Sequence, residues 1–334
     1  MHYIVFGVAF LTCASLAHAQ EWSPSRVDSH APIGVMGDHV HEAGEVMLSF
    51  RAMHMRMDGN RSDGAQKTVD EVLVDYPVAP LNMPMTMYMA GFMYAPTSRV
   101  TVMGMLPVLQ SSMDHRMRNG NEFTTESGGI GDLSVSALVA LGEGDRNRWH
   151  LNLGLGFPTG SIDERGDTPA ASDVRLPYPM QVGSGTLDVL PGLTYLAQRD
   201  FWSWGAQGLA TVHLGENDNG YSLGERATLT TWGSVNLRDA LSASLRLSVE
   251  SWGNVTGADT TLNPRMVPTT DPDLRGGTQS DLGIGMSIYT RGGSLAGHRL
   301  SMEWSIPVYR NVNGPQLERD WKLVVGWQKA FATR

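Results

Sequence analysis

The sequence predicts an all-β protein: a transmembrane, antiparallel, up-and-down β-barrel of about twelve strands with both termini on the periplasmic side. Three observations lead to this prediction. Short runs of alternating apolar and polar residues recur along the chain. The connections between these runs alternate between short and long. Beyond an N-terminal export signal, no stretch reaches the roughly 18 consecutive apolar residues that a membrane-spanning helix needs.

The N-terminus has the pattern of a secretory signal peptide. Residues 3–16 are largely apolar, and Ala17-His18-Ala19 is a small-x-small cleavage site, so we expect residues 1–19 to be removed. The alternative is a short apolar N-terminal strand. Cys13, the only cysteine, lies in this segment. The mature chain is therefore expected to contain neither disulfides nor thiolate metal sites.

The charge balance excludes one class of partner. The chain carries a net charge of −9, and residues 1–19 contain no Asp, Glu, Lys or Arg, so cleavage leaves this value unchanged. A net negative charge argues against nucleic acid as a partner. It does not argue against a membrane protein.

We expect the barrel to occupy residues 45–334. Its strands are predicted near residues 45–57, 83–94, 100–112, 131–141, 148–158, 186–197, 201–213, 226–237, 241–252, 280–290, 298–309 and 320–331. Residues 20–44 precede the barrel as a periplasmic N-terminal segment, which is long enough to enter the barrel as a plug. The clearest alternation is that of Leu241, Ala243, Leu245, Leu247 and Val249 against Ser242, Ser244, Arg246, Ser248 and Glu250.

The connections place the strands relative to a membrane. Short ones are expected at 95–99, 142–147, 198–200, 238–240 and 291–297, and long ones at 58–82, 113–130, 159–185, 214–225, 253–279 and 310–319. Outer-membrane barrels have short periplasmic turns and long external loops. Aromatic residues near strand ends, such as Trp149, Phe157 and Trp202, fit interfacial girdles. A soluble barrel or sandwich shows similar alternation, but the short–long rhythm would then be accidental.

Four short stretches carry a resemblance to a known family. They are Tyr94-Ala95-Pro96-Thr97-Ser98-Arg99-Val100, Gly129-Ile130-Gly131-Asp132-Leu133, Gly156-Phe157-Pro158-Thr159-Gly160 and Trp321-Lys322-Leu323-Val324-Val325-Gly326-Trp327. With them the chain resembles the Gram-negative outer-membrane proteins named for the meta-pathway of phenol degradation. The resemblance implies a barrel, set in outer-membrane lipid, that moves small molecules. This chain departs from the pattern by ending Phe331-Ala332-Thr333-Arg334 and by its many methionines.

Methionines recur at intervals of two along the first three predicted strands. This strip consists of Met47, Met53, Met55, Met57, Met83, Met85, Met87, Met89, Met93, Met103 and Met105. A period of two places them on one face of the strands, opposite the apolar residues Leu48, Phe50, Phe92 and Val102. If that apolar face contacts lipid, the methionines line the lumen and the path of a solute.

Thioether and imidazole ligands suit copper, so copper is a candidate cargo for the methionine strip. A row of weak sites would allow an ion to move on. The candidate metal ligands are His39, His41, His54, Met113, His115 and Met117. We expect His54, His115 and Met117 to meet at the extracellular mouth, and His39 and His41 to lie at the periplasmic end. The alternatives are that the methionines only fill the interior or bind an apolar solute, and that the His39/His41 segment is simply exposed.

Charged and polar residues are expected on the remaining inward faces. They are Asp132, His150, Asp188, His213, Arg246, Glu250, Asp281, Arg299, Glu303 and Lys322. Two interpretations remain open: a salt-bridged interior that holds the barrel in shape, and a selectivity wall that places Arg246 and Glu250 on the solute path.

These observations favour an outer-membrane transporter or channel for small solutes, with copper ions as one cargo and a periplasmic delivery protein as one partner. Uptake of small aromatic or hydrophobic compounds and a non-conducting, metal-binding or structural barrel are the alternatives. A lipid hydrolase would need a Ser–His pair, and the nearest candidates, His298 and Ser301, fall on opposite faces. We therefore expect no enzyme.

Overall fold

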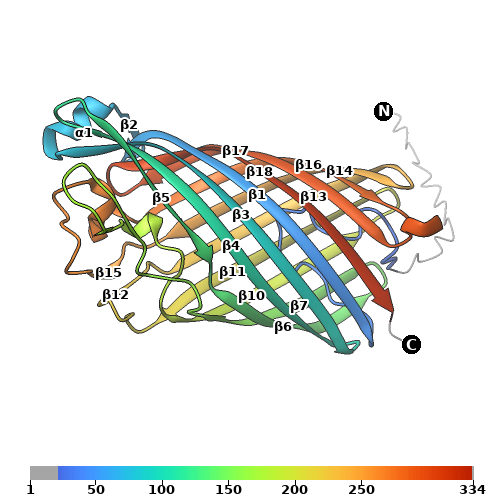
Figure 1. Ribbon diagram of the computed structural model, residues 1–334. Coiled ribbons are helices and arrows are strands. Elements are labelled where there is room, and N and C mark those ends of the chain that lie inside the picture. Colours follow the sequence, from blue (N-terminus) through green and yellow to red (C-terminus); the bar gives the residue numbers. More distant parts are fainter. Residues whose placement is uncertain (1–21, 333–334) are drawn as a thin grey trace, which may run out of the picture.

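The computed structural model describes residues 22–332, which form a closed antiparallel β-barrel (Figure 1). The predicted signal peptide, residues 1–19, lies outside the described residues. Within residues 22–332, twelve strand positions make the wall, as the sequence predicted. They are β1 (Glu45–Ser62), β3 (Val78–Thr97), β4 (Val100–Met117), β5 (Glu122–Ile130) continued by β6 (Leu133–Gly144), β7 (Asn147–Phe157), β10 (Leu187–Gln198), β11 (Trp202–Leu214), β13 (Arg226–Arg238), β14 (Leu241–Trp252), β16 (Gly277–Tyr289), β17 (His298–Val312) and β18 (Gln316–Ala332).

The barrel closes where the last strand pairs with the first. Glu45 lies opposite Ala332 at one end of this seam, and Arg61 lies opposite Gln316 at the other. A spanning sheet must close in this way because a lipid interior offers no partner to a free strand edge. Glu45 and Ala332 lie at the end of the barrel that carries the short turns.

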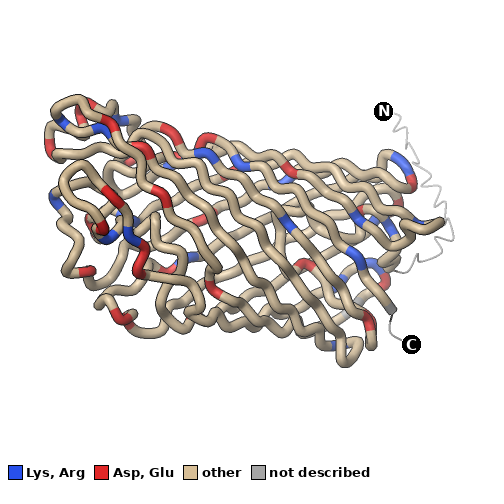
Figure 2. Tube along the Cα trace, viewed as in Figure 1, with Lys and Arg blue, Asp and Glu red and all other residues tan. Residues whose placement is uncertain are grey.

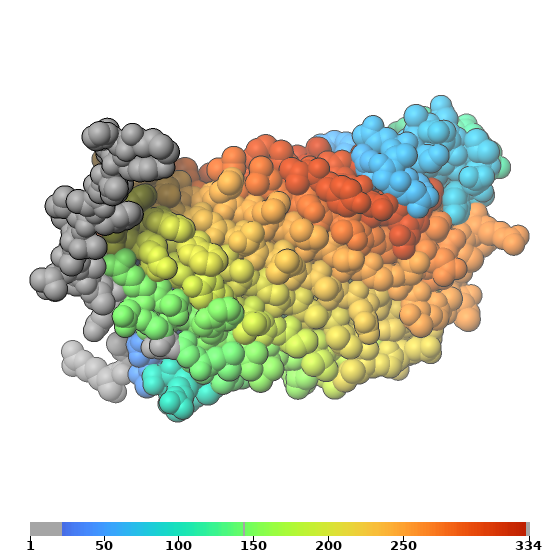
Figure 3. All heavy atoms as spheres, turned by 180° about the vertical axis from the view of Figure 1, so that it is seen from behind, coloured from blue at the N-terminus to red at the C-terminus, as the bar shows by residue number. Residues whose placement is uncertain are grey.

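The two faces of the wall have opposite chemistry. Leu245 and Leu300 face outward with 54% of their surfaces exposed, whereas Arg246 and Glu303 face inward with 4% and 1% exposed. From behind, the outer wall is continuous from the green to the orange segments (Figure 3). Figure 2 shows many charged residues in the loops and turns at the two ends, and others along the strands between them. The outer surface between the ends is therefore an apolar band of the kind that faces lipid.

Three of the six predicted long loops are wrong in extent. Within residues 58–82, β1 runs on to Ser62 and β3 already begins at Val78, so only residues 63–77 connect the two strands. Residues 113–130 are mostly strand, because β4 runs on to Met117 and β5 begins at Glu122. Residues 310–319 are strand except for a tight turn at 313–315. The extensions at residues 113–130 and 310–319 are polar and carry no apolar period. Their backbones continue the strand ladders, and side chains add cross-strand hydrogen bonds. Asp114, for example, accepts hydrogen bonds from Thr124 at 2.6 Å and Asn82 at 3.0 Å.

The wall is interrupted between β5 and β6, where β4 changes partner. Asp132 lies in this break, and its carboxylate accepts the N–H groups of Gly160 at 2.9 Å and Ser184 at 2.7 Å. The Thr159 hydroxyl accepts the Leu133 N–H and donates to the Gly131 carbonyl oxygen, both at 2.8 Å. Two of the stretches that carry the family resemblance thus meet here, and they fix both ends of the loop at 158–186.

The long loops contain small elements of their own. Helix α1 (Val69–Asp75) begins at a capping box formed by Thr68 and Glu71. Strand β2 (Ala65–Lys67) pairs with β1, β8 (Arg165–Gly166) with β9 (Val174–Arg175), and β12 (Tyr221–Ser222) with β15 (Thr256–Gly257). Short 3-10 turns span Tyr178–Met180, Pro268–Thr270, Pro272–Leu274 and Gly293–Leu295. Among residues 22–332, no helix has the length and apolarity that crossing a membrane requires.

The apolar band predicts that a charged side chain on the outer face lowers the free energy of unfolding more near the middle of the band than near its edge. Leu245 pairs with Gly233 and Ile284 near the middle of its strand, whereas Leu237 is the next-to-last residue of β13. We expect Leu245→Arg to lower the free energy of unfolding by about 2–4 kcal/mol and Leu237→Arg by about 0–1 kcal/mol. Guanidinium unfolding in phospholipid vesicles, followed by tryptophan fluorescence, measures both values. Equal costs at the two positions would contradict a lipid-facing band.

Candidate functional site

The N-terminal segment enters the barrel from the turn end and packs inside it. We call residues 22–44 the plug. The plug runs inward to a turn in which the Val35 N–H donates to the Pro32 carbonyl oxygen at 2.9 Å, and then runs back to β1. Gly34, in this turn, lies against the buried ion pair of Arg246 and Glu303, where a Cβ atom would overlap the Glu303 carboxylate. The plug therefore reaches the charged wall of the lumen.

Inward side chains of the wall hold the plug mainly through its backbone oxygens. The Gly37 carbonyl oxygen accepts hydrogen bonds from His150 Nε2 and Asn152 Nδ2, both at 2.9 Å. Gln207 donates to the Met36 carbonyl oxygen at 2.9 Å. Arg299 donates to the carbonyl oxygens of Arg26 and Val27, and Ser203 to that of Asp28. These donors come from β7, β11 and β17, so the plug is held from several sides.

Apolar contacts complete the seat of the plug. Ala31 and Val35 pack with Leu196 and Trp232. Val40 packs against the methionines of a second cluster, made of Met47, Met93, Met103 and Leu138. The turn-end part of the methionine strip thus contacts the plug.

The structure places the methionine strip on the inward face. Met47, Met55, Met83, Met89, Met93 and Met103 are buried, and Met53, Met57, Met85, Met87 and Met105 are half-buried. The residues expected to contact lipid, among them Phe50 and Phe92, are 47% and 49% exposed. Inward orientation of the methionines agrees with the sequence prediction, whereas their role in a solute path stays a prediction.

The loop end of the strip is covered by a cap. Met83 and Met113 pack with Leu176 and Met180 of the loop at 158–186. Tyr178, in the same loop, lies edge-on to Tyr221 at 4.9 Å between ring centroids, and its hydroxyl accepts the Asp259 N–H at 3.1 Å. The loops at 158–186, 215–225 and 253–276 thereby join over the mouth.

The expected meeting of His54 with His115 and Met117 is wrong. His54 lies between Met53 and Met55 in β1, and alternation therefore turns its side chain outward, where it bonds Thr86 at 2.9 Å and contacts Trp321. β1 also continues to Ser62, so His54 is far from the end of its strand. His115 is 3% exposed and stacks on Phe123 at 4.7 Å, and Met117, half-buried, is the last residue of β4.

The predicted polar residues form ion pairs and hydrogen bonds across the interior. Arg246 donates from Nε and Nη2 to the Glu303 carboxylate at 2.6–3.0 Å. Glu250 pairs with Arg226 and lies 3.6 Å from Arg319, which also pairs with Asp281. His213 donates from Nδ1 to Asp188 at 2.7 Å. This pairing matches the interpretation of a salt-bridged interior.

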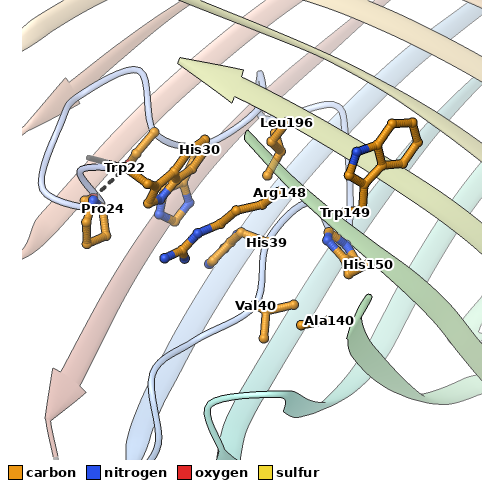
Figure 4. A pocket seen from close by; sticks show the side chains of 11 residues that line it. Trp22, Pro24, His30, His39, Val40, Ala140, Arg148, Trp149, His150 and Leu196 are labelled. Atoms are coloured by element: carbon orange, nitrogen blue, oxygen red, sulfur yellow. Dashed lines mark hydrogen bonds between the residues drawn. The ribbon is translucent and has the colours of Figure 1, made fainter. Parts of the chain in front are cut away.

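His39 and His41 lie in the plug and are 9% and 6% exposed, so this part of the segment is not an exposed tail. Sequence reasoning missed His30 and Asp38, which the fold brings beside His39. Figure 4 shows His30 and His39 lining one pocket. Burial lowers the pKa of His30 well below its usual value, and Arg299 and His39 add to the effect. Burial likewise lowers the pKa of His41. Both imidazoles are therefore neutral at pH 7. Although burial alone would raise it, the pKa of Asp38 is lowered by His39, so this carboxylate is ionised.

No protein-family model and no curated protein matches this sequence. Among solved structures, the COG4313 outer membrane channel from Pseudomonas putida F1 is similar, with a TM-score of 0.63 and 14% identity over 89% of this chain and 99% of that chain. The transport unit of the autotransporter AIDA-I from Escherichia coli has a TM-score of 0.50 and 9% identity over 89% of this chain and 93% of that chain. The likeness shows that the fold is that of outer-membrane barrels.

The contact at Gly34 predicts that a side chain at this position displaces the plug from its place inside the barrel. A chain expressed from residue 20 has no cysteine, so Ser29→Cys, at a position 3% exposed, supplies a single thiol. We expect a maleimide to label this thiol slowly in the parent and at least several-fold faster with Gly34→Val, because the valine overlaps Glu303. Gly104→Ala is the control, since its Cβ meets open space. An unchanged labelling rate with Gly34→Val would contradict the packing of Gly34 against Glu303.

Proposed function

We propose that this protein is an outer-membrane channel for small solutes whose lumen is regulated by the plug. The observation that carries the proposal is a closed barrel with an apolar outer band and a two-sided interior, entered by the chain's own residues 22–44. A barrel with a purely structural role would not need the plug, a separate segment that the wall holds through its backbone. The bound plug and the cap make this an occluded state of the channel.

The proposal includes the route by which the protein reaches the membrane. Residues 1–19 are proposed to direct export, residues 20–44 to lie on the periplasmic side, and residues 45–334 to insert in outer-membrane lipid. Short turns at the plug end fit a periplasmic orientation of that end. A periplasmic delivery protein would meet the channel there. The family named for the meta-pathway of phenol degradation is proposed on the four sequence stretches alone.

Removal of the plug tests regulation of the lumen directly. We expect a chain lacking residues 22–44 to conduct at least several-fold more current in planar bilayers than the parent, because the donors at His150, Gln207 and Arg299 then face an open lumen. Gly34→Val should raise conductance in the same direction and Gly104→Ala should not. Heat-modified migration on gels confirms that each barrel is folded. Folded, plug-free barrels that conduct no more than the parent would contradict the proposal.

Copper transport along the methionine strip is proposed as a narrower function. The thioethers lie on one inward face in three neighbouring strands, and cross-strand pairs such as Met53–Met87 and Met55–Met85 bring them together. Packing competes with this role at both ends of the strip, where Met47, Met93 and Met103 contact the plug and Met83 and Met113 contact the cap. Of the half-buried methionines, Met57, Met85 and Met105 also pack against these clusters, which leaves Met53 and Met87 as the ones available to an ion.

Leucine substitution separates a copper path from packing, because leucine conserves the volume of methionine and removes the soft ligand. The variant changes Met53, Met55, Met85, Met87, Met103 and Met105 to Leu. A copper path predicts that the parent binds Cu(I) in a competition titration and that the folded variant loses at least most of this binding. A parent that ignores Cu(I) would contradict the copper proposal and leave the methionines as packing or as a surface for an apolar solute.

A further inference from the structure

Three imidazoles of the plug lie together at the turn end of the lumen. The ring centroids of His30 and His39 are 3.9 Å apart, and those of His39 and His41 are 4.7 Å apart. Ligand atoms of His30, Asp38 and His39 all lie within 4.8 Å of one another. The three histidines line one cleft of about 260 Å³ between the plug and the turn-side ends of β1, β17 and β18.

Each of these imidazoles has one buried nitrogen without a hydrogen bond. His30 Nδ1, His39 Nε2 and His41 Nε2 have no hydrogen-bond partner among residues 22–332. A buried polar atom without a partner is unfavourable, and native proteins contain few of them. Unpartnered nitrogens on three neighbouring rings therefore indicate a ligand that binds at this cluster.

Two carboxylates fix the orientation of the rings. His39 Nδ1 donates to Asp38 Oδ1 at 2.9 Å, and His41 Nδ1 donates to Glu45 Oε2 at 3.1 Å. The other oxygen of Asp38 accepts the Ala31 N–H at 2.8 Å, which ties the carboxylate to the neighbouring arm of the plug. When Nδ1 carries the proton, Nε2 presents its lone pair. This arrangement of carboxylate and imidazole is the one that orients histidine ligands in metal sites.

We propose that the plug binds one divalent transition-metal ion, Zn(II) or Cu(II), at His30 and His39, whose ligand atoms already lie together, and that His41, the next ring along, turns in to join them as the ion binds. Neutral imidazoles are the ligands that these two ions prefer when no thiolate is present. Asp38 and Glu45 are positioning residues that hold the rings and supply negative charge. This site lies on the plug, at the turn end of the methionine strip, where Met47 lines the same cleft.

Two of the cations that line the cleft, Arg299 and Arg148, are already engaged. Arg299 donates to the backbone of Arg26 and to the Ser29 hydroxyl at 3.1 and 3.2 Å, and Arg148 lies 3.6 Å from the Glu42 carboxylate. Lys329 also lines the cleft, from β18. Glu42 and Glu45 line the same cleft, so an ion entering from the turn end meets carboxylates beside the three imidazoles.

The ion would join the two arms of the plug. His30 precedes the turn at residues 32–35, whereas His39 and His41 follow it. Coordination by both arms closes the plug into a loop and should stabilise its seated form, because only the seated form brings the three imidazoles together. This regulatory consequence rests on the proposed channel function, whereas the metal site itself does not.

Isothermal titration of the detergent-solubilised chain from residue 20, without a polyhistidine tag and stripped with EDTA, tests the site with Zn(II) and Cu(II). We expect one ion per chain. His30→Ala, His39→Ala and His41→Ala should each weaken binding at least tenfold, and Asp38→Asn by about tenfold or more. His54→Ala, on the outer face, is the matched control and should bind as the parent does. In the copper titration, nitrogen hyperfine splitting in the electron paramagnetic resonance spectrum should show imidazole ligation.

The maleimide labelling rate of the Ser29→Cys thiol distinguishes loss of a metal ligand from displacement of the plug. A His39→Ala chain that still labels slowly but binds weakly has lost a ligand, which supports the site. Absence of binding by the parent, or unchanged affinity in a chain carrying both His39→Ala and His41→Ala, would overturn it.

Conductance separates the metal site from the channel. Zn(II) on the turn side should lower the parent current several-fold and leave that of His39→Ala unchanged. Binding without conductance in any plug-free barrel would refute the channel and keep the site. Conductance in plug-free barrels without binding by the parent would refute the site and keep the channel.

Discussion

Closure of the sheet between β18 and β1 is the constraint on which the rest of the structure depends. Once every strand has two neighbours, each side chain must face either lipid or the lumen. The apolar outer band follows from this, and so does the burial of charged groups such as Arg246 and Glu303 in the interior. The buried charges are tolerable because they pair with one another, and the space between them is occupied by the plug.

Much of this architecture was accessible from local sequence patterns, because a period of two defines a strand and its faces within a few residues. The runs beginning at Leu241 and the methionines of β1, β3 and β4 were placed on the correct faces for this reason. The extensions of β4 and β5 were missed because their residues, such as Asp114 and Thr124, are polar and carry no apolar period. The error at His54 had a different cause: its position between two inward methionines already required an outward side chain.

The candidate site was less predictable, since its contacts join residues distant in sequence. Gly34 meets Glu303, Gly37 meets His150, and no local pattern encodes either pair. His39 and His41 could be named as candidate ligands from their spacing. His30 and Asp38 become partners only through the turn at residues 32–35, which brings the two arms of the plug together.

Because side chains of the wall bind the backbone of the plug, the order in which the wall and the plug fold is constrained. Its hydrogen-bond donors lie on strands distributed from β7 to β17, although the plug itself precedes β1 in the chain. A segment that precedes β1 therefore has no complete binding surface until nearly all of the wall has formed. Docking of the plug must be a late step of folding, and until then the backbone of the plug is exposed to solvent and to proteases.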